Sequence, residues 1–267
     1  ELGKLEKAEI SCRKAISLKP NYAEAHHNLG VVLYSKGNID KGIESLAKAN
    51  VIDPNSRESD LVLSVLKGRK TRKQTEIKTN NSNEIRYKFG LKSNPFFLKR
   101  TVEPELIMSL SQLQSRKMDE AKNTPVFGNG RCSLDYNMFD QACPSIKNLE
   151  TDLTELMKSA VNSDIYIYDS FFNIYGAGAG IPPHTHLSAI DKDKYLNLAK
   201  QKYSLVYYVS VGDQNCSEPG FFKLYDPEEQ ILPSTGMVII IPADRVHSAV
   251  YNGTKDRIII GINFYSL

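Results

Sequence analysis

The first 67 residues repeat with a period of 34, and no other feature of the sequence restricts the fold as strongly. Small or helix-ending residues recur 34 positions apart, in the pairs Gly3 and Gly37, Ala8 and Gly42, Ala15 and Ala49, and Pro20 and Pro54. Small residues let two helices approach closely, larger side chains such as Leu29, Leu33 and Leu46 fill the space beside them, and proline ends the second helix. The pattern predicts stacked helices, an α-solenoid, over residues 1–67.

These residues, at this period, resemble the tetratricopeptide repeat family. The segment holds half a repeat, one whole repeat and a further helix, predicted for Arg57 to Lys67, that caps the stack. Fewer than about three repeats rarely fold alone, so other repeats or the rest of the chain must cover the open end. Because the sequence starts inside a helical pattern without an initiator methionine, we interpret it as a fragment. The resemblance implies a protein or peptide partner for the repeat helices.

A polar and basic segment, residues 68–86, follows the repeats and is interpreted as a solvated linker, because it lacks the interleaved aromatic residues of a nucleic-acid-binding patch. The net charge of +3 is too small to indicate nucleic acid as an obligate partner. The longest apolar run, Gly236 to Pro242, is far shorter than the ~20 residues of a membrane helix. The four cysteines form no CxxC pair, which favours free thiols. We expect a cytoplasmic protein without nucleic-acid or membrane partners.

The remaining residues, 87–267, change from helices to strands. Leucines at helical spacing predict helices for Pro104–Ala121 and Asn148–Val161, and a helical insertion is expected at Asp191–Lys202. Short apolar segments bounded by turn residues predict strands at Ile165–Tyr175, Leu205–Val211, Gly220–Tyr225, Gly236–Ile241 and Arg257–Phe264. A chain that closes on a run of short strands suggests a sandwich or jelly roll. The predicted class is α+β, an N-terminal α-solenoid followed by a double-stranded β-helix (jelly roll) with supporting helices.

Three of the five histidines lie in the strand-rich part. His184 and His186 are two residues apart, a spacing that on a strand turns both imidazoles to one face. His247 follows about sixty residues later, after an apolar strand and a turn. Imidazole is a common metal ligand, so the three residues are candidates for one metal site. His26 and His27 lie in a repeat helix and are expected to be structural.

Arg257 opens an otherwise apolar strand ten residues after His247. An arginine that points into a barrel requires an anion, because an unpaired buried guanidinium is costly. Its planar fork suits two hydrogen bonds to one carboxylate. The alternative is an arginine at the exposed start of the strand, paired with Asp256 or with an acid in a loop.

In their order and spacing, His184, His247 and Arg257 resemble the 2-oxoglutarate-dependent oxygenases. That family has a His-x-Asp pair, a distal histidine and, about ten residues later, an arginine that binds the far carboxylate of 2-oxoglutarate. The approach Asn173 to Gly180 resembles that of prolyl hydroxylases, and Tyr207-Tyr208 resembles their Tyr-Tyr strand. The resemblance covers roughly residues 165–267.

The resemblance implies an Fe(II)- and 2-oxoglutarate-dependent dioxygenase that uses O₂ and hydroxylates its substrate. The repeat helices favour a protein or peptide substrate, and a small-molecule substrate stays open. It implies His184, His186 and His247 as the iron ligands. It implies contacts to the small-molecule cosubstrate from Arg257, Tyr208, Tyr175 and Asn173. No catalytic residue beyond these ligands is expected.

One position departs from the family, because His186 stands where the second ligand is usually Asp or Glu. Three imidazoles can bind Fe(II), but they leave the site one charge unit more positive. Two alternatives therefore stay open. A cupin with a three-histidine metal site would use the same fold, although it does not predict Arg257 at this spacing. A repeat scaffold whose barrel binds metal or ligand without turnover is the other.

Overall fold

The computed structural model describes residues 2–79, 95–122 and 125–267. The chain divides into two compact units. The helical unit comprises residues 1–90, 189–198 and 267, and the β unit comprises residues 91–188 and 199–266. Among the described helices, none combines the length and the apolar character needed to cross a membrane.

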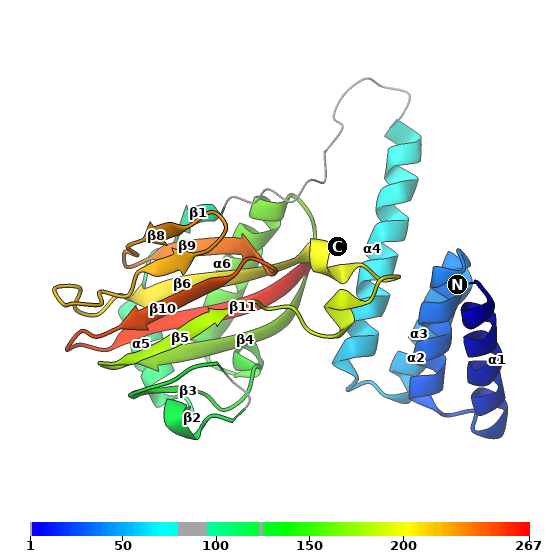
Figure 1. The fold of residues 1–267 in the computed structure, drawn as a ribbon, viewed down its shortest axis with the longest axis horizontal. Coiled ribbons are helices and arrows are strands. Elements are labelled where there is room, and N and C mark those ends of the chain that lie inside the picture. Colours follow the sequence, from blue (N-terminus) through cyan, green and yellow to red (C-terminus); the bar gives the residue numbers. More distant parts are fainter. Residues whose placement is uncertain (1, 80–94, 123–124) are drawn as a thin grey trace. The chain divides into compact units, whose positions relative to one another are not determined.

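The helical unit is built on close helix contacts at glycine. Gly30 and Gly42 lie on neighbouring helices, and a Cβ added to Gly30 would fall 2.6 Å from Leu46 Cγ and 2.9 Å from the Gly42 carbonyl oxygen. Buried Leu29, Leu33 and Leu46 fill the space around this contact, as the 34-residue period predicts. The helices, shown in Figure 1, are α1 Leu2–Leu18, α2 Ala23–Ser35, α3 Ile39–Ile52 and α4 Arg57–Thr79.

Helix α4 is longer than the sequence indicates. The predicted capping helix ends at Lys67, but α4 continues to Thr79, so the expectation of a linker is wrong for residues 68–79. This part contains Arg, Lys, Gln and Glu, which favour helix, and no proline. The rest of the predicted linker, residues 80–86, lies outside the described residues.

Two antiparallel sheets form the β unit. The described strands of the large sheet follow the order β1-β9-β6-β11-β4-β3-β2, and those of the small sheet follow the order β5-β10-β7-β8. The strands are β1 Phe96–Lys99, β2 Ser115–Lys117, β3 Gly130–Ser133, β4 Ile165–Tyr175, β5 Ala179–His184, β6 Lys202–Ser210, β7 Phe222–Leu224, β8 Glu229–Ile231, β9 Met237–Pro242, β10 His247–Tyr251 and β11 Arg257–Ser266. The prediction of an α-solenoid followed by a jelly roll is confirmed.

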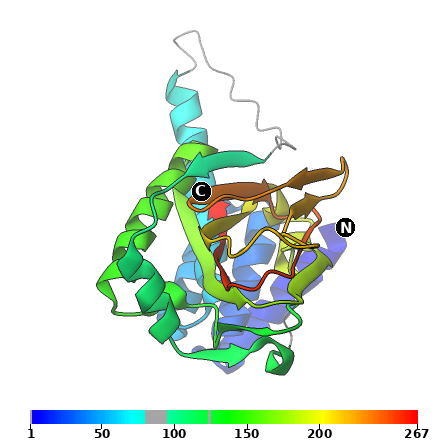
Figure 2. The same ribbon diagram turned by 90° about the vertical axis from the view of Figure 1, so that its left-hand side faces the viewer.

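The side chains of strand β11 point alternately to the two faces of the large sheet. Its residues Ile258, Ile260 and Ile262 pack with the helices α5 Pro104–Gln112 and α6 Pro144–Val161 in one apolar core. In Figure 2 these helices lie outside the strands, and the strands of the two sheets enclose a common interior. Because side chains alternate along a strand, the odd-numbered residues of β11 face that interior. This alternation delivers Arg257 to the inside of the sandwich.

Two helix predictions within residues 87–267 are wrong. The predicted helix Pro104–Ala121 ends at Gln112, because residues 115–117 form β2 and pair with β3. The predicted insertion Asp191–Lys202 contains only the short 3₁₀ turns Ile190–Lys192 and Leu198–Gln201. There the Asp193 carboxylate accepts the N–H groups of residues 195 and 196, and Asn197 has a left-handed φ of 50°. Both features compete with a continuous helix.

We expect Gly30→Ala to destabilise the helical unit by about 1–3 kcal/mol, because the added methyl group meets Leu46 and the Gly42 backbone in a packed contact. Gly3→Ala is the control, since nothing lies within 4 Å of a Cβ there and alanine favours helix over glycine. Urea unfolding followed by far-UV circular dichroism measures both. Equal stability of the two variants would contradict the close helix contact.

Candidate functional site

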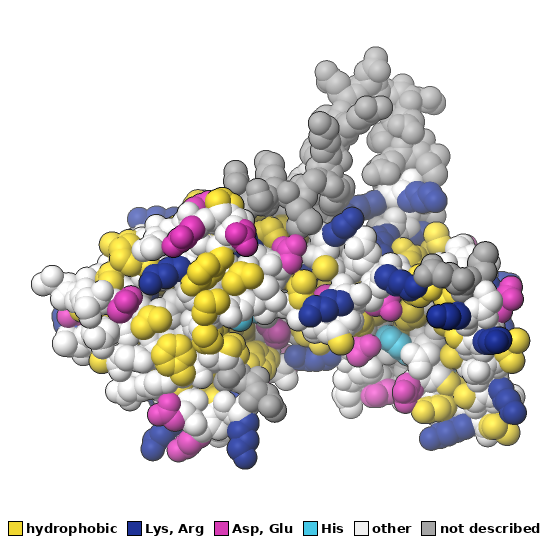
Figure 3. Space-filling model, viewed as in Figure 1, with side chains coloured by type: hydrophobic (Ala, Val, Ile, Leu, Met, Phe, Trp, Pro, Cys, Tyr) yellow, Lys and Arg dark blue, Asp and Glu magenta, His cyan; other side chains and the backbone are white. Residues whose placement is uncertain are grey.

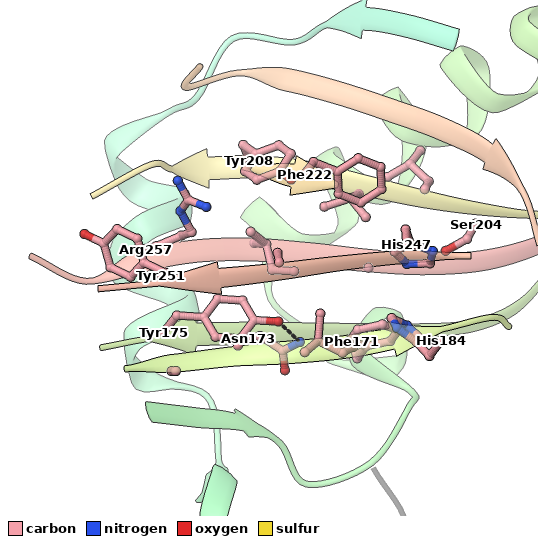
Figure 4. A pocket seen from close by; sticks show the side chains of 18 of the residues that line it. Phe171, Asn173, Tyr175, His184, Ser204, Tyr208, Phe222, His247, Tyr251 and Arg257 are labelled. Carbon is pink, nitrogen blue, oxygen red and sulfur yellow. Dashed lines mark hydrogen bonds between the residues drawn. The ribbon is translucent and has the colours of Figure 1, made fainter. Parts of the chain in front are cut away.

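A pocket of about 560 Å³, partly open to solvent, lies between the two sheets. The large sheet contributes residues of β4, β6 and β11, and the small sheet contributes residues of β5, β7 and β10. Figure 4 shows His184 and His247 at one end of this pocket and Arg257 with Tyr251 at the other. The sequence-predicted site residues all line it, namely Asn173, Tyr175, His184, His186, Tyr208, His247 and Arg257.

The three histidines converge although only two of them lie on strands. His184 ends β5, and His247 begins β10 directly opposite it. His186 follows β5, where its backbone N–H donates to the Ala243 carbonyl at 2.8 Å. The three ring centroids are 4.3–5.0 Å apart. The expectation that His184 and His186 share one strand is therefore wrong for His186, which lies beyond the end of β5. The two rings nevertheless lie close together.

Backbone carbonyls fix the orientation of two of the imidazoles. His184 Nδ1 lies 2.9 Å from the Pro182 oxygen, and His247 Nδ1 lies 3.1 Å from the Arg245 oxygen. A carbonyl oxygen only accepts, so each Nδ1 carries the hydrogen and each Nε2 keeps its lone pair. His184 Nε2 is buried and has no hydrogen-bond partner among the described residues. A metal ion could bind to the free lone pair of this nitrogen.

Burial keeps the three imidazoles neutral. It lowers the pKa of His184, lowers the pKa of His247 to about 3, and lowers the pKa of His186 well below its ordinary value. The neighbouring histidines add to the shifts of His186 and His247, because two imidazolium ions at this distance would repel each other. At neutral pH the cluster therefore offers uncharged nitrogen ligands.

The ligand nitrogens gather around one place that a metal ion could occupy, and the distance between two of them already matches that between metal-bound nitrogens. Ligand atoms from the three residues all lie within 4.8 Å of one another, and His186 Nε2 is 3.2 Å from His247 Nε2. Two nitrogens bound to one ion at the usual 2.0–2.1 Å lie roughly 2.9–3.4 Å apart, for angles between octahedral and tetrahedral. Imidazole suits several transition metals, so this cluster by itself indicates a metal and not which metal.

Arg257 is buried at the opposite end, with a relative exposure of 1%. Its Nη1 and Nη2 donate to the Gly220 and Pro219 carbonyls at 2.5 and 2.6 Å, and its Nε donates to the Val211 carbonyl at 3.3 Å. Of the five N–H donors of a guanidinium, two remain. No carboxylate of residues 2–79, 95–122 or 125–267 pairs with it. The alternative of an exposed arginine paired with Asp256 is wrong.

Two tyrosine rings hold the Arg257 guanidinium. It lies 4.7 Å from the ring centroid of Tyr251 and 5.8 Å from that of Tyr208. Burial lowers the pKa of Arg257, against the opposite effect of the surrounding tyrosines. Backbone carbonyls and aromatic faces carry only partial negative charge. An anionic ligand would supply the missing full charge.

Tyr175 and Asn173 lie in the same wall of the pocket. Asn173 Nδ2 donates to the Tyr175 hydroxyl oxygen at 3.1 Å, as Figure 4 shows. Complete burial raises the pKa of Tyr175 and that of Tyr208, so both phenols stay protonated. The Tyr175 hydroxyl therefore accepts from Asn173 and can donate its own hydrogen to a ligand.

The sequence interpretation missed several residues in the pocket and beside it. Tyr251 stacks on Arg257, Phe222 packs 5.2 Å from the His247 ring, and Gly220 contacts the guanidinium through its carbonyl. A signal for Tyr251 existed, because His247, Ala249 and Tyr251 alternate and all line the pocket. It was overlooked because β10 was not predicted as a strand.

The site reaches the surface of the β unit. On the face seen in Figure 3, hydrophobic side chains gather on this unit and a histidine is visible among them. His184 and His186 are partly exposed, whereas His247 is buried, so one side of the histidine cluster is open to solvent.

Comparisons with known proteins give the following likenesses. The chain is similar to a prolyl hydroxylase from Trichoplax adhaerens in complex with a hypoxia inducible factor peptide fragment (TM-score 0.49, 13% identity, 66% of this chain and 84% of that chain). It is similar to a Pseudomonas putida prolyl-4-hydroxylase (0.44, 16%, 66% and 94%). It is also similar to an oxidoreductase of the 2OG-Fe(II) oxygenase family from Burkholderia pseudomallei (0.47, 13%, 65% and 86%). No curated protein sequence matches.

Family models match the helical unit. Residues 1–37 match a model described as TPR repeat, and residues 23–56 match one described as tetratricopeptide repeat. Residues 1–56 are tetratricopeptide repeats. The prediction made from the 34-residue period is confirmed for these residues.

Gly220→Ala should displace the Arg257 guanidinium, because a Cβ at position 220 would collide with it. Gly178→Ala is a matched control, since both glycines have φ +79° and nothing lies within 4 Å of a Cβ at position 178. The control carries only the strain of a left-handed alanine, about 1–2 kcal/mol. We expect Gly220→Ala to cost at least about 2 kcal/mol more in urea unfolding, because a buried charge loses its hydrogen bonds. Equal losses would contradict the placement of Arg257.

Proposed function

We propose that the β unit is an Fe(II)- and 2-oxoglutarate-dependent dioxygenase that hydroxylates a protein or peptide substrate. One observation carries the proposal. A buried guanidinium, which pairs with no carboxylate of the described residues, lies at one end of a pocket, and three neutral imidazoles that could hold one metal ion lie at the other. A dicarboxylate that binds a metal at one end and an arginine at the other satisfies both ends at once.

Each predicted site residue takes a role in this proposal. His184, His186 and His247 would hold Fe(II), since their ligand atoms lie close together and the Nδ1 hydrogen bonds of His184 and His247 leave the Nε2 lone pairs of these two rings available. Arg257 would bind the far carboxylate of 2-oxoglutarate through its two remaining N–H donors. Tyr175, oriented by Asn173, and Tyr208 would donate hydrogen bonds from their protonated phenols.

The chemistry that Fe(II), 2-oxoglutarate and O₂ supply at such a site is hydroxylation. One atom of O₂ enters a C–H bond of the substrate, and the other enters 2-oxoglutarate, which loses CO₂ and becomes succinate. The protein residues bind and orient the reactants. Apolar side chains of the pocket such as Val206, Phe222 and Ile259 exclude water from the reacting centre.

The third imidazole changes the charge of the site. Neutral His186 in place of a carboxylate leaves a site with Fe(II) at +2 instead of +1. The extra positive charge favours a dianionic cosubstrate such as 2-oxoglutarate in the ground state. It also leaves the iron less electron-rich, so we expect slower oxidation than at a site with one carboxylate ligand.

The proposal extends to the partner and the location. Tetratricopeptide repeats form extended surfaces that suit peptides, so we propose that the repeat helices bind a protein or peptide. All four cysteines are free, as expected for a reducing cytoplasm, where we propose that the protein acts. Residues 87–267 are proposed as the oxygenase domain.

We expect metal-free protein to bind about one Mn(II) or Fe(II) ion per chain without oxygen, and the His184→Ala/His247→Ala variant to lose that binding, because two of three ligands are gone. His26→Ala, in a repeat helix, is the control and should bind like the wild type. His186→Asp should retain the metal, since a carboxylate also binds it. Electron paramagnetic resonance of Mn(II) gives the stoichiometry. Undiminished binding by the double variant would refute the site.

Arg257→Ala should weaken 2-oxoglutarate binding to the metal-loaded protein by about 2–5 kcal/mol, because the far carboxylate loses its charged partner in a buried pocket. Arg257→Lys should restore only part of the affinity, since a point charge cannot make both hydrogen bonds. Anaerobic titration measures affinity, and succinate is measured after oxygen is admitted. A cupin would bind metal without any dependence on 2-oxoglutarate, and a scaffold would form no succinate. Unchanged affinity in Arg257→Ala would remove the main support for the oxygenase.

A further inference from the structure

A second pocket, of about 600 Å³, meets the histidine cluster. Its walls come from β2, β3, β4, β5 and β11 of the β unit. It shares lining residues with the first pocket, namely Phe171, Asn173, Ile181, His184 and His186. In Figure 4, Phe171 and His184 lie at the end of the first pocket opposite Arg257. A ligand in the second pocket would therefore reach the histidines without occupying the space next to Arg257.

Unpaired polar atoms concentrate in the walls of this second pocket. Five buried side-chain atoms of the described residues have no hydrogen-bond partner, and three of them belong to residues that line it: Arg116 Nε, His184 Nε2 and Asn263 Oδ1. The histidine atom belongs to the proposed metal site. The other two atoms are a donor and an acceptor, and the proposed iron and cosubstrate do not use them.

The orientation of Asn263 is fixed by its neighbour. Its side-chain Nδ2 donates to Asp169 Oδ1 at 2.7 Å, and its backbone N–H donates to the same oxygen at 3.2 Å. The amide group is thereby held with Oδ1 unpaired, and the residue is only 6% exposed. An unsatisfied buried acceptor costs free energy, so it indicates a site for a ligand that donates a hydrogen bond.

The two unpaired atoms select the chemistry of the ligand. Arg116 Nε donates, so it requires an acceptor such as a carbonyl, whereas Asn263 Oδ1 requires an N–H or O–H donor. A carboxylate would satisfy Arg116, but it would leave Asn263 without a donor and would lie in the same pocket as Asp135. An amide-bearing chain offers both C=O and N–H. The nearby apolar wall includes Phe171, whose ring packs edge-on with Tyr136 at 5.3 Å.

We propose that the second pocket is the substrate site, and that Arg116 and Asn263 bind the C=O and N–H groups of a peptide whose C–H bond is presented to the histidine cluster. The inference rests on the proposed oxygenase function and adds the location of the substrate and the groups that recognise it. Arg116 and Asn263 are substrate-binding residues in this proposal. They play no part in holding the metal or 2-oxoglutarate.

The test uses acetyl-Gly-Xaa-Gly-amide tripeptides, one for each amino acid, as probes. Their binding to the Mn(II)-loaded full chain with 2-oxoglutarate is measured without oxygen by ligand-detected NMR. Arg116→Met and Asn263→Leu should each weaken the best peptide by on the order of tenfold, because each removes one hydrogen bond to a buried group. Arg131→Met is the matched control, since Arg131 lies on the neighbouring strand β3, carries the same charge and lines neither pocket.

An ester analogue of the best peptide tests the proposal without any change to the protein. Replacing the amide N–H by an ester oxygen removes the donor for Asn263, so we expect weaker binding to the wild type and no further loss in Asn263→Leu. This measurement decides the matter even where a variant fails to fold. Equal binding of peptide and ester to the wild type would overturn the assignment of Asn263.

The remaining outcomes separate this inference from the proposed function. If the wild type forms succinate and neither Arg116→Met nor Asn263→Leu changes peptide affinity, the proposed substrate site is wrong and the proposed oxygenase function is retained. Peptide binding that depends on both residues, without any turnover of 2-oxoglutarate, would support the binding site and overturn the oxygenase. Binding of free asparagine but of no tripeptide would overturn the peptide assignment, because the amide would then belong to a small molecule.

Discussion

The pairing of β10 with β5 is the constraint on which the site depends. His247 lies directly opposite His184, whereas Ala249 lies opposite Ile181, so β5 has one extra residue between these pairs. Pro182 and Pro183 lie in that bulge. Proline cannot donate a ladder hydrogen bond and is tolerated on an edge strand such as β5. Without the bulge the register would shift by one residue, and one of the two imidazoles would turn away from the interior.

Much of the fold could be predicted from the sequence because the signals there are local. The small residues at a period of 34 report helix contacts such as that of Gly30 with Gly42. The apolar strand that Arg257 opens was predicted because its isoleucines are consecutive. The segment 68–79 was misread because charged residues suit both a solvated linker and an exposed helix, and the sequence does not decide between them.

The candidate site was predictable in its residues but not in its geometry. His184, His247 and Arg257 stood out by residue type and spacing, and all three line one pocket. The partners of Arg257 were not predictable, because they are the backbone carbonyls of residues 211, 219 and 220. Every residue has such a carbonyl, so the residue type at these positions gives no signal. Tyr251 was missed for a related reason. Strand β10 has five residues and forms through its pairing with β5 and β7, which is information from distant parts of the chain.

Strand β11 contributes residues to both pockets, and it places a different polar group in each. Its interior-facing residues run from Arg257 through Ile259 and Gly261 to Asn263, so a charged donor and an amide acceptor lie roughly 20 Å apart along one strand. Between them Gly261 lacks a side chain, and the space that a Cβ would need is filled by the Phe171 ring. That ring lines both pockets beside the histidines. A larger residue at 261 would push it from the place where the pockets meet. The strand thus places a buried guanidinium at one end, an unpaired amide oxygen at the other, and an aromatic wall between them.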